Sequence, residues 1–266
     1  MKCYGILIVL VVTVLKEVLN QCTNSPYRTF GGSCNNLQNP TWGSVNTPFS
    51  RLIPANYGDG KSSPPGAKDG TDLPNARLLS VEVFEEDVQN SPDFTLVNMQ
   101  FGQVVAHDMA LTRGGLLGQN YMQSVGLQYA TTGFSNDYNS TVNPSVINSH
   151  TASAFRFFHS SIQGILKFYE ESRKSLTKID INDHTNNPTI LEQTSDRYPN
   201  LLHGMTTQPM GLNDASLDPA TKHFLFRFNN MFGVDLKALD IQRGRDHGLP
   251  RYNNFAYYCY KKRAST

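Results

Sequence analysis

Three polar side chains lie at helical spacing inside an otherwise apolar stretch of this sequence. Gln100, Gln103 and His107 fall at i, i+3 and i+7 between Phe94 and Thr112, which places them on one narrow stripe of a helix. A helix that is apolar on nearly every side is normally buried, and buried polar groups need partners. The stripe is therefore either a hydrogen-bond network in the core or the wall of a pocket that holds a further group. Periodicity alone favours the network.

A second pair of chemically useful residues lies further along the chain. Arg156 and His159 are three residues apart in an aromatic-rich stretch, which puts them on one face of a helix. A buried neutral histidine among apolar side chains is a good iron ligand through one ring nitrogen, provided that the other nitrogen has an acceptor. The alternative is an ordinary core histidine with a surface arginine.

A third group of charged residues follows near the C-terminus. Arg243, Arg245, Asp246 and His247 are crowded into a short, glycine-bearing stretch that we expect to form a turn. Such a turn is usually a solvated charged loop, but it can also clamp an anion.

The elements that must position these residues are mostly helices, because helical spacing of apolar residues dominates over strand-like alternation. Ser91 can cap the first helix, with Pro92 in its first turn. We therefore predict a mainly α fold with few short strands and long irregular surface loops. The predicted helices begin at 91, span 149–169 and span 217–239, and the predicted loops span 22–77 and 180–202.

Composition and the N-terminus restrict the function classes. The 266 residues, 39% hydrophobic and 17% charged with a net charge of +1, describe a globular chain without a preference for nucleic acid. Lys2 precedes an apolar run at 5–15 that is too short to span a bilayer, so residues 1–21 read as a secretory signal peptide and 22–266 as the mature chain. No later segment is predicted to span a membrane. In an oxidising compartment, Cys22 and Cys34 form a plausible disulfide, which leaves Cys259 without a partner.

Three stretches in order resemble one protein family. Residues 94–112 (FTLVNMQFGQVVAHDMALT) resemble the distal helix of the animal haem peroxidases, and 153–164 (SAFRFFHSSIQG) resemble the proximal helix. Residues 238–253 (ALDIQRGRDHGLPRYN) resemble the family's RGRDHG motif, which is the most specific of the three. Residues 27–60 also resemble the opening segment of the family, which wraps the surface as a strap. The resemblance covers most of the chain from Cys22 to Cys259.

The resemblance implies a role for several residues. On the distal side, Gln103 and His107 would lie over the open face of a haem, and His107 would move a proton between the oxygens of hydrogen peroxide. On the proximal side, His159 would be the axial ligand of the haem iron and Arg156 would approach a haem propionate. Arg243 would lie against the haem. Asp240, where the family usually has asparagine, would either orient His159 or pair with Arg243.

The chain also departs from the family. Only 52 positions separate His107 from His159, far fewer than in the family, and the missing block follows Thr112 and includes the distal arginine. Ala106 replaces the aspartate that forms an ester with haem, so a bound haem b would be non-covalent. Asp108 stands at the position of a calcium ligand, but calcium takes six to eight oxygens, which argues against a complete calcium site.

Three functions follow as hypotheses. The first is a secreted haem peroxidase that uses hydrogen peroxide to oxidise a small electron donor in response to oxidative stress, with activity reduced by the missing block. The second is a non-catalytic secreted remnant that binds an extracellular-matrix or cell-surface partner. The third, an unrelated core with coincident polar residues, is disfavoured by three motifs in the family's order. Haem content separates the first hypothesis from the other two.

Overall fold

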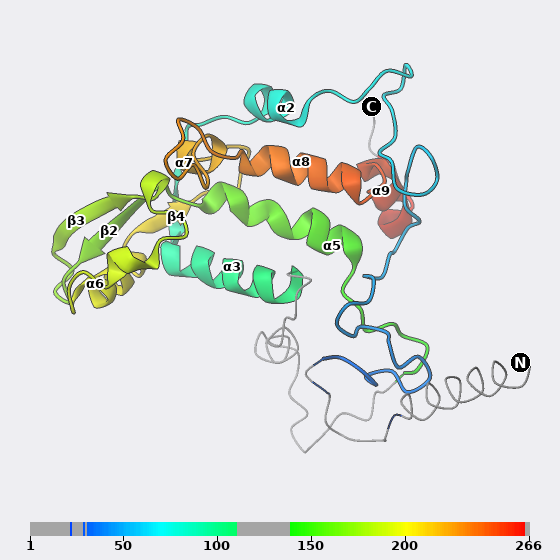
Figure 1. The fold of residues 1–266 in the computed structure, drawn as a ribbon, viewed down its shortest axis with the longest axis horizontal. Helices are drawn as coiled ribbons and strands as arrows, with labels where there is room; N and C mark the ends of the chain where they lie inside the picture. Colours follow the sequence, from blue (N-terminus) through cyan, green and yellow to red (C-terminus); the bar gives the residue numbers. More distant parts are fainter. Residues whose placement is uncertain (1–21, 23–28, 30, 111–138, 264–266) are drawn as a thin grey trace, which may run out of the picture. The chain divides into compact units, whose positions relative to one another are not determined.

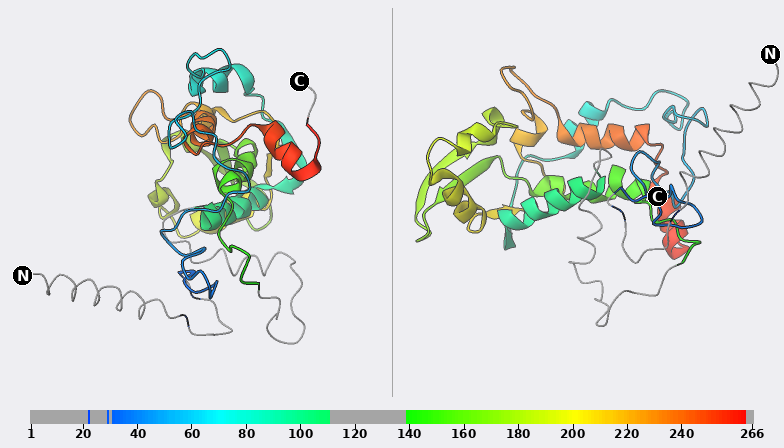
Figure 2. Two further views of the ribbon diagram at one scale, coloured as in Figure 1. Left: turned by 90° about the vertical axis from the view of Figure 1, so that its right-hand side faces the viewer. Right: turned by 60° about the horizontal axis from the view of Figure 1, so that its bottom comes forward.

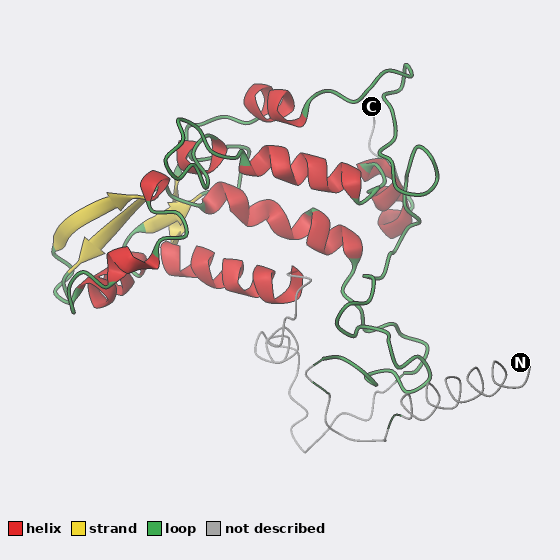
Figure 3. Ribbon diagram, in the orientation of Figure 1, coloured by secondary structure: helices red, strands yellow, loops and turns green. Residues whose placement is uncertain are grey.

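A computed structural model describes residues 22, 29, 31–110 and 139–263, except for the side chains of 106–110. The fold is mainly α with two small sheets, as predicted (Figures 1 and 3). The chain divides into two compact units, 1–50 with 108–147 and 51–107 with 148–266. The elements are α2 (Ala76–Val83), β1 (Asn90–Thr95), α3 (Leu96–Ala110), α5 (Asn148–Ala152), η1 (Ala154–Ser161), β2 (Ile165–Tyr169), β3 (Ser175–Asp180), η2 (Ile181–Asp183), η3 (Pro188–Leu191), α6 (Arg197–Met205), β4 (Pro209–Gly211), α7 (Pro219–Lys222), α8 (Leu236–Asp246) and α9 (Tyr252–Tyr260).

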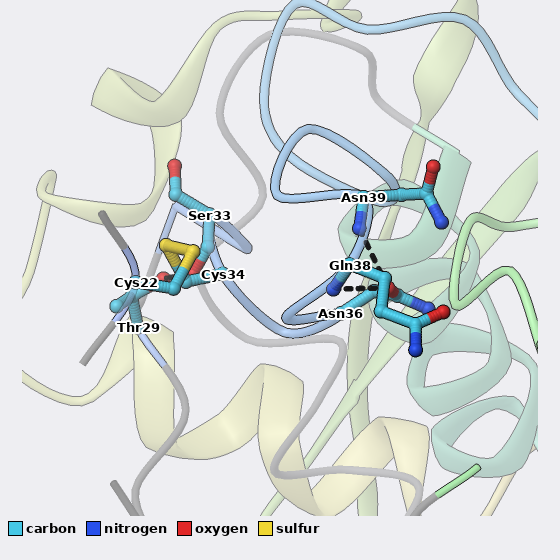
Figure 4. The surroundings of a disulfide bond; sticks show 7 residues. All are labelled: Cys22, Thr29, Ser33, Cys34, Asn36, Gln38 and Asn39. Carbon is cyan, nitrogen blue, oxygen red and sulfur yellow. Dashed lines mark hydrogen bonds between the residues drawn. A yellow bond between two sulfur atoms is a disulfide. The ribbon is translucent and has the colours of Figure 1, made fainter. Parts of the chain in front are cut away.

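The described part of the first unit is held by a disulfide and an asparagine. Cys22 and Cys34 are bonded, with Cα atoms 5.4 Å apart, which confirms the predicted pair (Figure 4). The buried Asn36 accepts hydrogen bonds from the amides of Gln38 and Asn39 through Oδ1. Its Nδ2 donates to the carbonyl oxygen of Ser140 at 2.8 Å. One side chain therefore closes a local turn and joins it to a segment that is distant in the sequence.

Three helical segments form the body of the second unit. In Figures 1 and 2, α5 and the η1 segment that follows it lie between α3 and α8. A Cβ added at Gly102 of α3 would lie 2.9 Å from the ring of Phe158 in η1, so a larger residue here would displace that ring. At the other side, η1 reaches α8 through the side chains of His159 and Asp240. This arrangement places His159, which follows Phe158 in the sequence, against α8.

The helix α3 is buried on one side only, which differs from the expectation of a helix buried all round. Leu96 and Met99 are buried with Met210 in a hydrophobic cluster, and Val105 is also buried. Val97 and Val104, spaced at i and i+7, are exposed on the other side. The apolar composition of this helix therefore does not predict which of its side chains are buried.

Two predicted helix boundaries were wrong because long-range contacts override the local pattern. The helix expected from Ser91 begins at Leu96, since residues 90–95 pair antiparallel with β4. The helix expected over 149–169 ends at Ser161, and β2 then pairs with β3. The amide of Gly164, between them, donates to Asp218 Oδ2 at 2.8 Å.

The region near the C-terminus shows the same effect. Of the helix expected over 217–239, the structure keeps α7 and the first residues of α8. Between them, Leu225 and Val234 form an isolated antiparallel bridge. Asp235 then caps α8 by accepting from the amides of Lys237 and Ala238. The charged stretch 243–246 is the last turn of this helix and not the expected irregular turn. The expected surface loop at 180–202 contains η2, η3 and the start of α6.

The described residues include no helix that is both long and apolar enough to cross a membrane. Among the same residues, Cys259 is a free and exposed cysteine, as predicted.

A partly buried ionic network ties α2 and α7 to the segment between α2 and β1. Lys222 has only 2% of its side chain exposed, and its Nζ donates to the Phe84 carbonyl at 2.6 Å and lies 3.1 Å from Glu86 Oε1. His223 Nε2 donates to the same carboxylate oxygen at 2.7 Å. His223 Nδ1 can accept there from Arg77, whose guanidinium also pairs with Asp235. The network replaces the water that these charges lose on burial.

Glu86 should make the stability of the protein depend on pH in the acidic range. The hydrogen bond from His223 lowers the pKa of Glu86 below its usual 4.5, with Lys222 adding to it, although burial alone raises the pKa. Because the folded-state pKa is lowered, this contribution to stability is present above pH 4.5 and is lost as the pH falls through the folded-state value.

We therefore expect Glu86→Gln to lower the free energy of unfolding at pH 7 by about 1–2 kcal/mol. This is less than the 3–5 kcal/mol lost when a fully buried pair is broken, because Glu86 is 44% exposed. Below pH 4.5 the difference from the parent should shrink. Urea denaturation of the variant and the parent at pH 7 and below pH 4.5 measures this difference in the free energy of unfolding. The variant Glu82→Gln, at an exposed position of α2, is the control. A difference that is equal at both pH values would contradict the assignment.

Candidate haem site

His159 and Asp240 form the centre of the candidate site. His159 Nδ1 lies 2.7 Å from Asp240 Oδ2, and the two side chains are 16% and 9% exposed. The residues are 81 positions apart in the sequence, and η1 and α8 bring them together. Since a carboxylate can only accept, the imidazole carries its proton on Nδ1 and directs the lone pair of Nε2 away from Asp240. A metal ligand needs this tautomer.

The Asp240 carboxylate is shared by three partners. Oδ1 accepts from Arg243 Nη1 at 2.7 Å, and Oδ2 lies 3.3 Å from Lys237 Nζ as well as facing His159. Burial raises the pKa of Asp240, but the hydrogen bond and charge of His159, the charge of Lys237 and the bond from Arg243 outweigh it and leave the pKa below its usual value. The carboxylate is therefore ionised at neutral pH. The two predicted alternatives for Asp240, orienting His159 and pairing with Arg243, occur together.

Arg156 adds positive charge to this group. Its Nε donates to the Thr151 carbonyl at 3.0 Å, so the side chain is held against α5. Burial lowers the pKa of Arg156, the charge of Arg243 lowers it further, and Asp240 partly opposes both. The positive charges of Arg156, Arg243 and Lys237 together exceed the single negative charge of the Asp240 carboxylate. An anionic group such as a propionate would relieve this excess of positive charge.

These features fit a haem at the proximal side. The imidazole presents Nε2 with its second nitrogen satisfied by an acceptor, and among the described residues no hydrogen bond to Nε2 is found. Arg156 and Arg243 supply cationic groups near the same carboxylate. The site could thus hold iron through His159 and carboxylates through the arginines.

The distal residues are only partly described. Gln103 lies on α3, partly buried, directly after the contact of Gly102 with Phe158. The backbone of His107 and Asp108 continues α3, but their side chains and that of Ala106 lie outside the described residues. The roles expected for His107, Asp108 and Ala106 therefore stay predictions.

Two further residues, Lys237 and His247, make contacts in this region that the sequence pattern did not specify. Lys237 was not among the predicted site residues, although it precedes Asp240 by three positions on one helix, a spacing that brings side chains together. His247 follows α8, and its Nδ1 lies 2.8 Å from Asn148 Nδ2 at the start of α5. Burial lowers the pKa of His247, and the nearby Arg51 and Arg243 charges add to this, which agrees with a neutral ring that accepts from Asn148. His247 thus links two helices.

Comparisons with known proteins test the family resemblance of the chain. The family model described as animal haem peroxidase matches residues 27–116 and 114–266. The two matches meet where the sequence predicts a missing block after Thr112. A peroxidase of Drosophila melanogaster is 24% identical over 443 aligned positions, which cover 91% of this chain and 64% of the relative. Because the alignment is much longer than the chain, the relative contains segments that this chain lacks.

Further relatives match shorter parts. The chorion peroxidase of Drosophila melanogaster is 36% identical over 140 residues, 53% of this chain and 17% of that protein. Lactoperoxidase of Mus musculus is 42% identical over 95 residues, 32% of this chain and 13% of that protein. The chain thus spans less than two thirds of the length of these relatives.

A solved structure shows the same fold. Peroxidase A from Dictyostelium discoideum superposes with a TM-score of 0.69 at 16% identity, covering 91% of this chain and 80% of that one. With the family model matched over nearly the whole range from residue 27 to residue 266, the chain belongs to the animal haem peroxidase family.

Proposed function

We propose that this chain is a haem-dependent peroxidase that uses hydrogen peroxide to oxidise a small electron donor. The observation that supports it most directly is the His159–Asp240 pair, which presents a lone pair on Nε2 beside two arginines. When bound, haem b supplies the redox chemistry for the reduction of peroxide. In this proposal His159 would hold the iron, and Arg156 and Arg243 would bind the anionic edge of the haem. The binding would be non-covalent because Ala106 has no carboxylate that could form an ester with haem.

The distal residues handle protons in this proposal. Gln103 and His107 lie on the peroxide side, and neutral His107 takes a proton from one peroxide oxygen and returns it to the other. The distal arginine lies in the missing block. Removing one such stabilising cation typically costs about a hundredfold or more in rate. We therefore expect slow turnover compared with full-length relatives.

Secretion is part of the proposal. The Cys22–Cys34 disulfide suits an oxidising compartment, and a signal peptide at 1–21 remains the interpretation of the N-terminus. In that location, hydrogen peroxide from oxidative stress would be the oxidising substrate. Asp108 remains a candidate calcium ligand without further ligands assigned to it.

A second candidate is a non-catalytic secreted protein that binds an extracellular-matrix or cell-surface partner. The missing block after Thr112 favours it, since the distal arginine lies there. Titrating the purified chain with haem decides between the two. A Soret band with a one-to-one pyridine haemochrome supports the peroxidase. A chain that stays folded by circular dichroism and takes up no haem supports the non-catalytic protein.

Asp240→Asn should raise the ferric/ferrous reduction potential of the bound haem. The carboxylate pulls the Nδ1 proton of His159 more strongly than an amide oxygen does, and the imidazole then donates more charge to the iron. Greater donation favours the ferric state, and an amide removes that preference. Spectroelectrochemical titration of both proteins measures the change. An unchanged or lower potential would show that Asp240 acts on Arg243 and not on the iron.

A further inference from the structure

Lys237 occupies an unusual position at the candidate site. It lies in the first turn of α8, where the positive end of the helix dipole disfavours a cation. Its side chain is nonetheless 17% exposed, with Nζ 4.9 Å from the centre of the Phe84 ring. The same Nζ lies 3.3 Å from Asp240 Oδ2. An aromatic ring and a carboxylate oxygen thus both contact the ammonium group.

The oxygen that Lys237 contacts is the oxygen that accepts from His159. Oδ2 lies 2.7 Å from His159 Nδ1, whereas Arg243 binds the other oxygen, Oδ1. A cation next to Oδ2 withdraws negative charge from it, and little water screens the interaction because the Asp240 side chain is 9% exposed. The hydrogen bond from His159 therefore meets a weaker acceptor than an Asp240 without Lys237 would provide.

We propose that Lys237 is a positioning residue that limits how strongly Asp240 polarises His159. The effect on the ligand pair is a property of the chain itself, and its effect on iron rests on the proposed function. A carboxylate alone would draw the imidazole towards imidazolate. Lys237 weakens this polarisation, so that Asp240 can accept the hydrogen bond of His159 without making the imidazole donate excessive charge to the iron.

Two neutral substitutions and one conservative substitution test this proposal. Lys237→Met keeps the length and the contact with Phe84 but removes the charge, and Lys237→Gln serves if the methionine variant does not fold. Lys237→Arg keeps the charge. In the haem-free protein, the neutral variant should move the ¹H resonance of the His159 Nδ1 proton downfield, because its acceptor becomes stronger. Lys237→Arg should leave the resonance near its original position.

The same substitution in the Asp240→Asn background separates a charge effect from a change in packing. There the neutral variant should leave the Nδ1 resonance unchanged, since the carboxylate is absent. A shift of equal size in both backgrounds, or none in the Asp240 background, would overturn the proposal. In the haem-loaded protein the neutral variant should lower the ferric/ferrous potential, opposite to Asp240→Asn.

The two readouts keep the two proposals apart. A resonance shift in a protein that takes up no haem leaves the role of Lys237 towards His159 in place and refutes the haem proposal. A protein with a Soret band, an unshifted resonance and an unchanged potential keeps the peroxidase proposal and refutes the role of Lys237.

Discussion

Replacing His159 by alanine should abolish the retention of haem after gel filtration. In the proposed function this side chain would be the iron ligand, and its second nitrogen, Nδ1, lies 2.7 Å from Asp240 Oδ2. Without the imidazole, the arginines can still attract the anionic edge but no protein atom bonds to the metal. The Soret absorbance per chain, read after removal of free haem, should fall to the background value.

His150→Ala is the matched control for this experiment. His150 lies in α5, close in sequence to His159, and its ring packs against Phe155 with centroids 4.7 Å apart. Burial lowers the pKa of His150, so it is also a partly buried neutral histidine. It should retain haem. Equal loss of haem in the two variants would show that the loss reflects packing of this region and not ligation.

Replacing His107 by alanine should leave haem bound and remove most peroxide-dependent oxidation. A positioned acid–base group typically contributes about 10²–10⁴-fold to the rate, because it carries the proton that must pass between the peroxide oxygens. The variant should therefore match the parent in Soret absorbance per chain. Its second-order rate constant with hydrogen peroxide, measured by stopped flow, should fall by about that factor.

The comparison of His107 and His159 tests the assignment of the two faces. If His107→Ala loses haem while His159→Ala retains it, the proximal and distal roles are reversed. If His107→Ala reacts with peroxide as fast as the parent, the proton is carried by another group and His107 is not catalytic. Imidazole added to the His107 variant provides a rescue readout, since a small base that titrates near neutral pH can restore a missing proton carrier.

Local sequence patterns were sufficient for the class of fold and for parts of the site. The spacing of apolar residues indicated a mainly α chain, and the twelve-residue interval between Cys22 and Cys34 indicated their disulfide. The order of three motifs identified the family and the residues His159, Asp240 and Arg243. These features are encoded by short stretches, because periodicity, capping and motif spacing depend on neighbouring residues.

Tertiary structure decided what those stretches do. Residues 165–169 have apolar residues at helical spacing, yet they form β2 because β3 supplies backbone partners. Apolar α3 is buried on one side only, since its neighbours in the described part of the chain cover that side. Local propensity is worth little per residue compared with such contacts.

The candidate site shows the same division. The sequence by itself determined which residues can ligate, accept or carry charge, and that Asp240 and Arg243 are three positions apart. Only the fold determined that His159, 81 positions earlier, lies against the same carboxylate, and that Phe84 and Asp240 enclose the ammonium group of Lys237. If His159 ligates iron as proposed, its strength as a ligand would depend on the charge at one oxygen atom, Asp240 Oδ2. That charge depends on contacts between residues far apart in the chain, which no local pattern specifies.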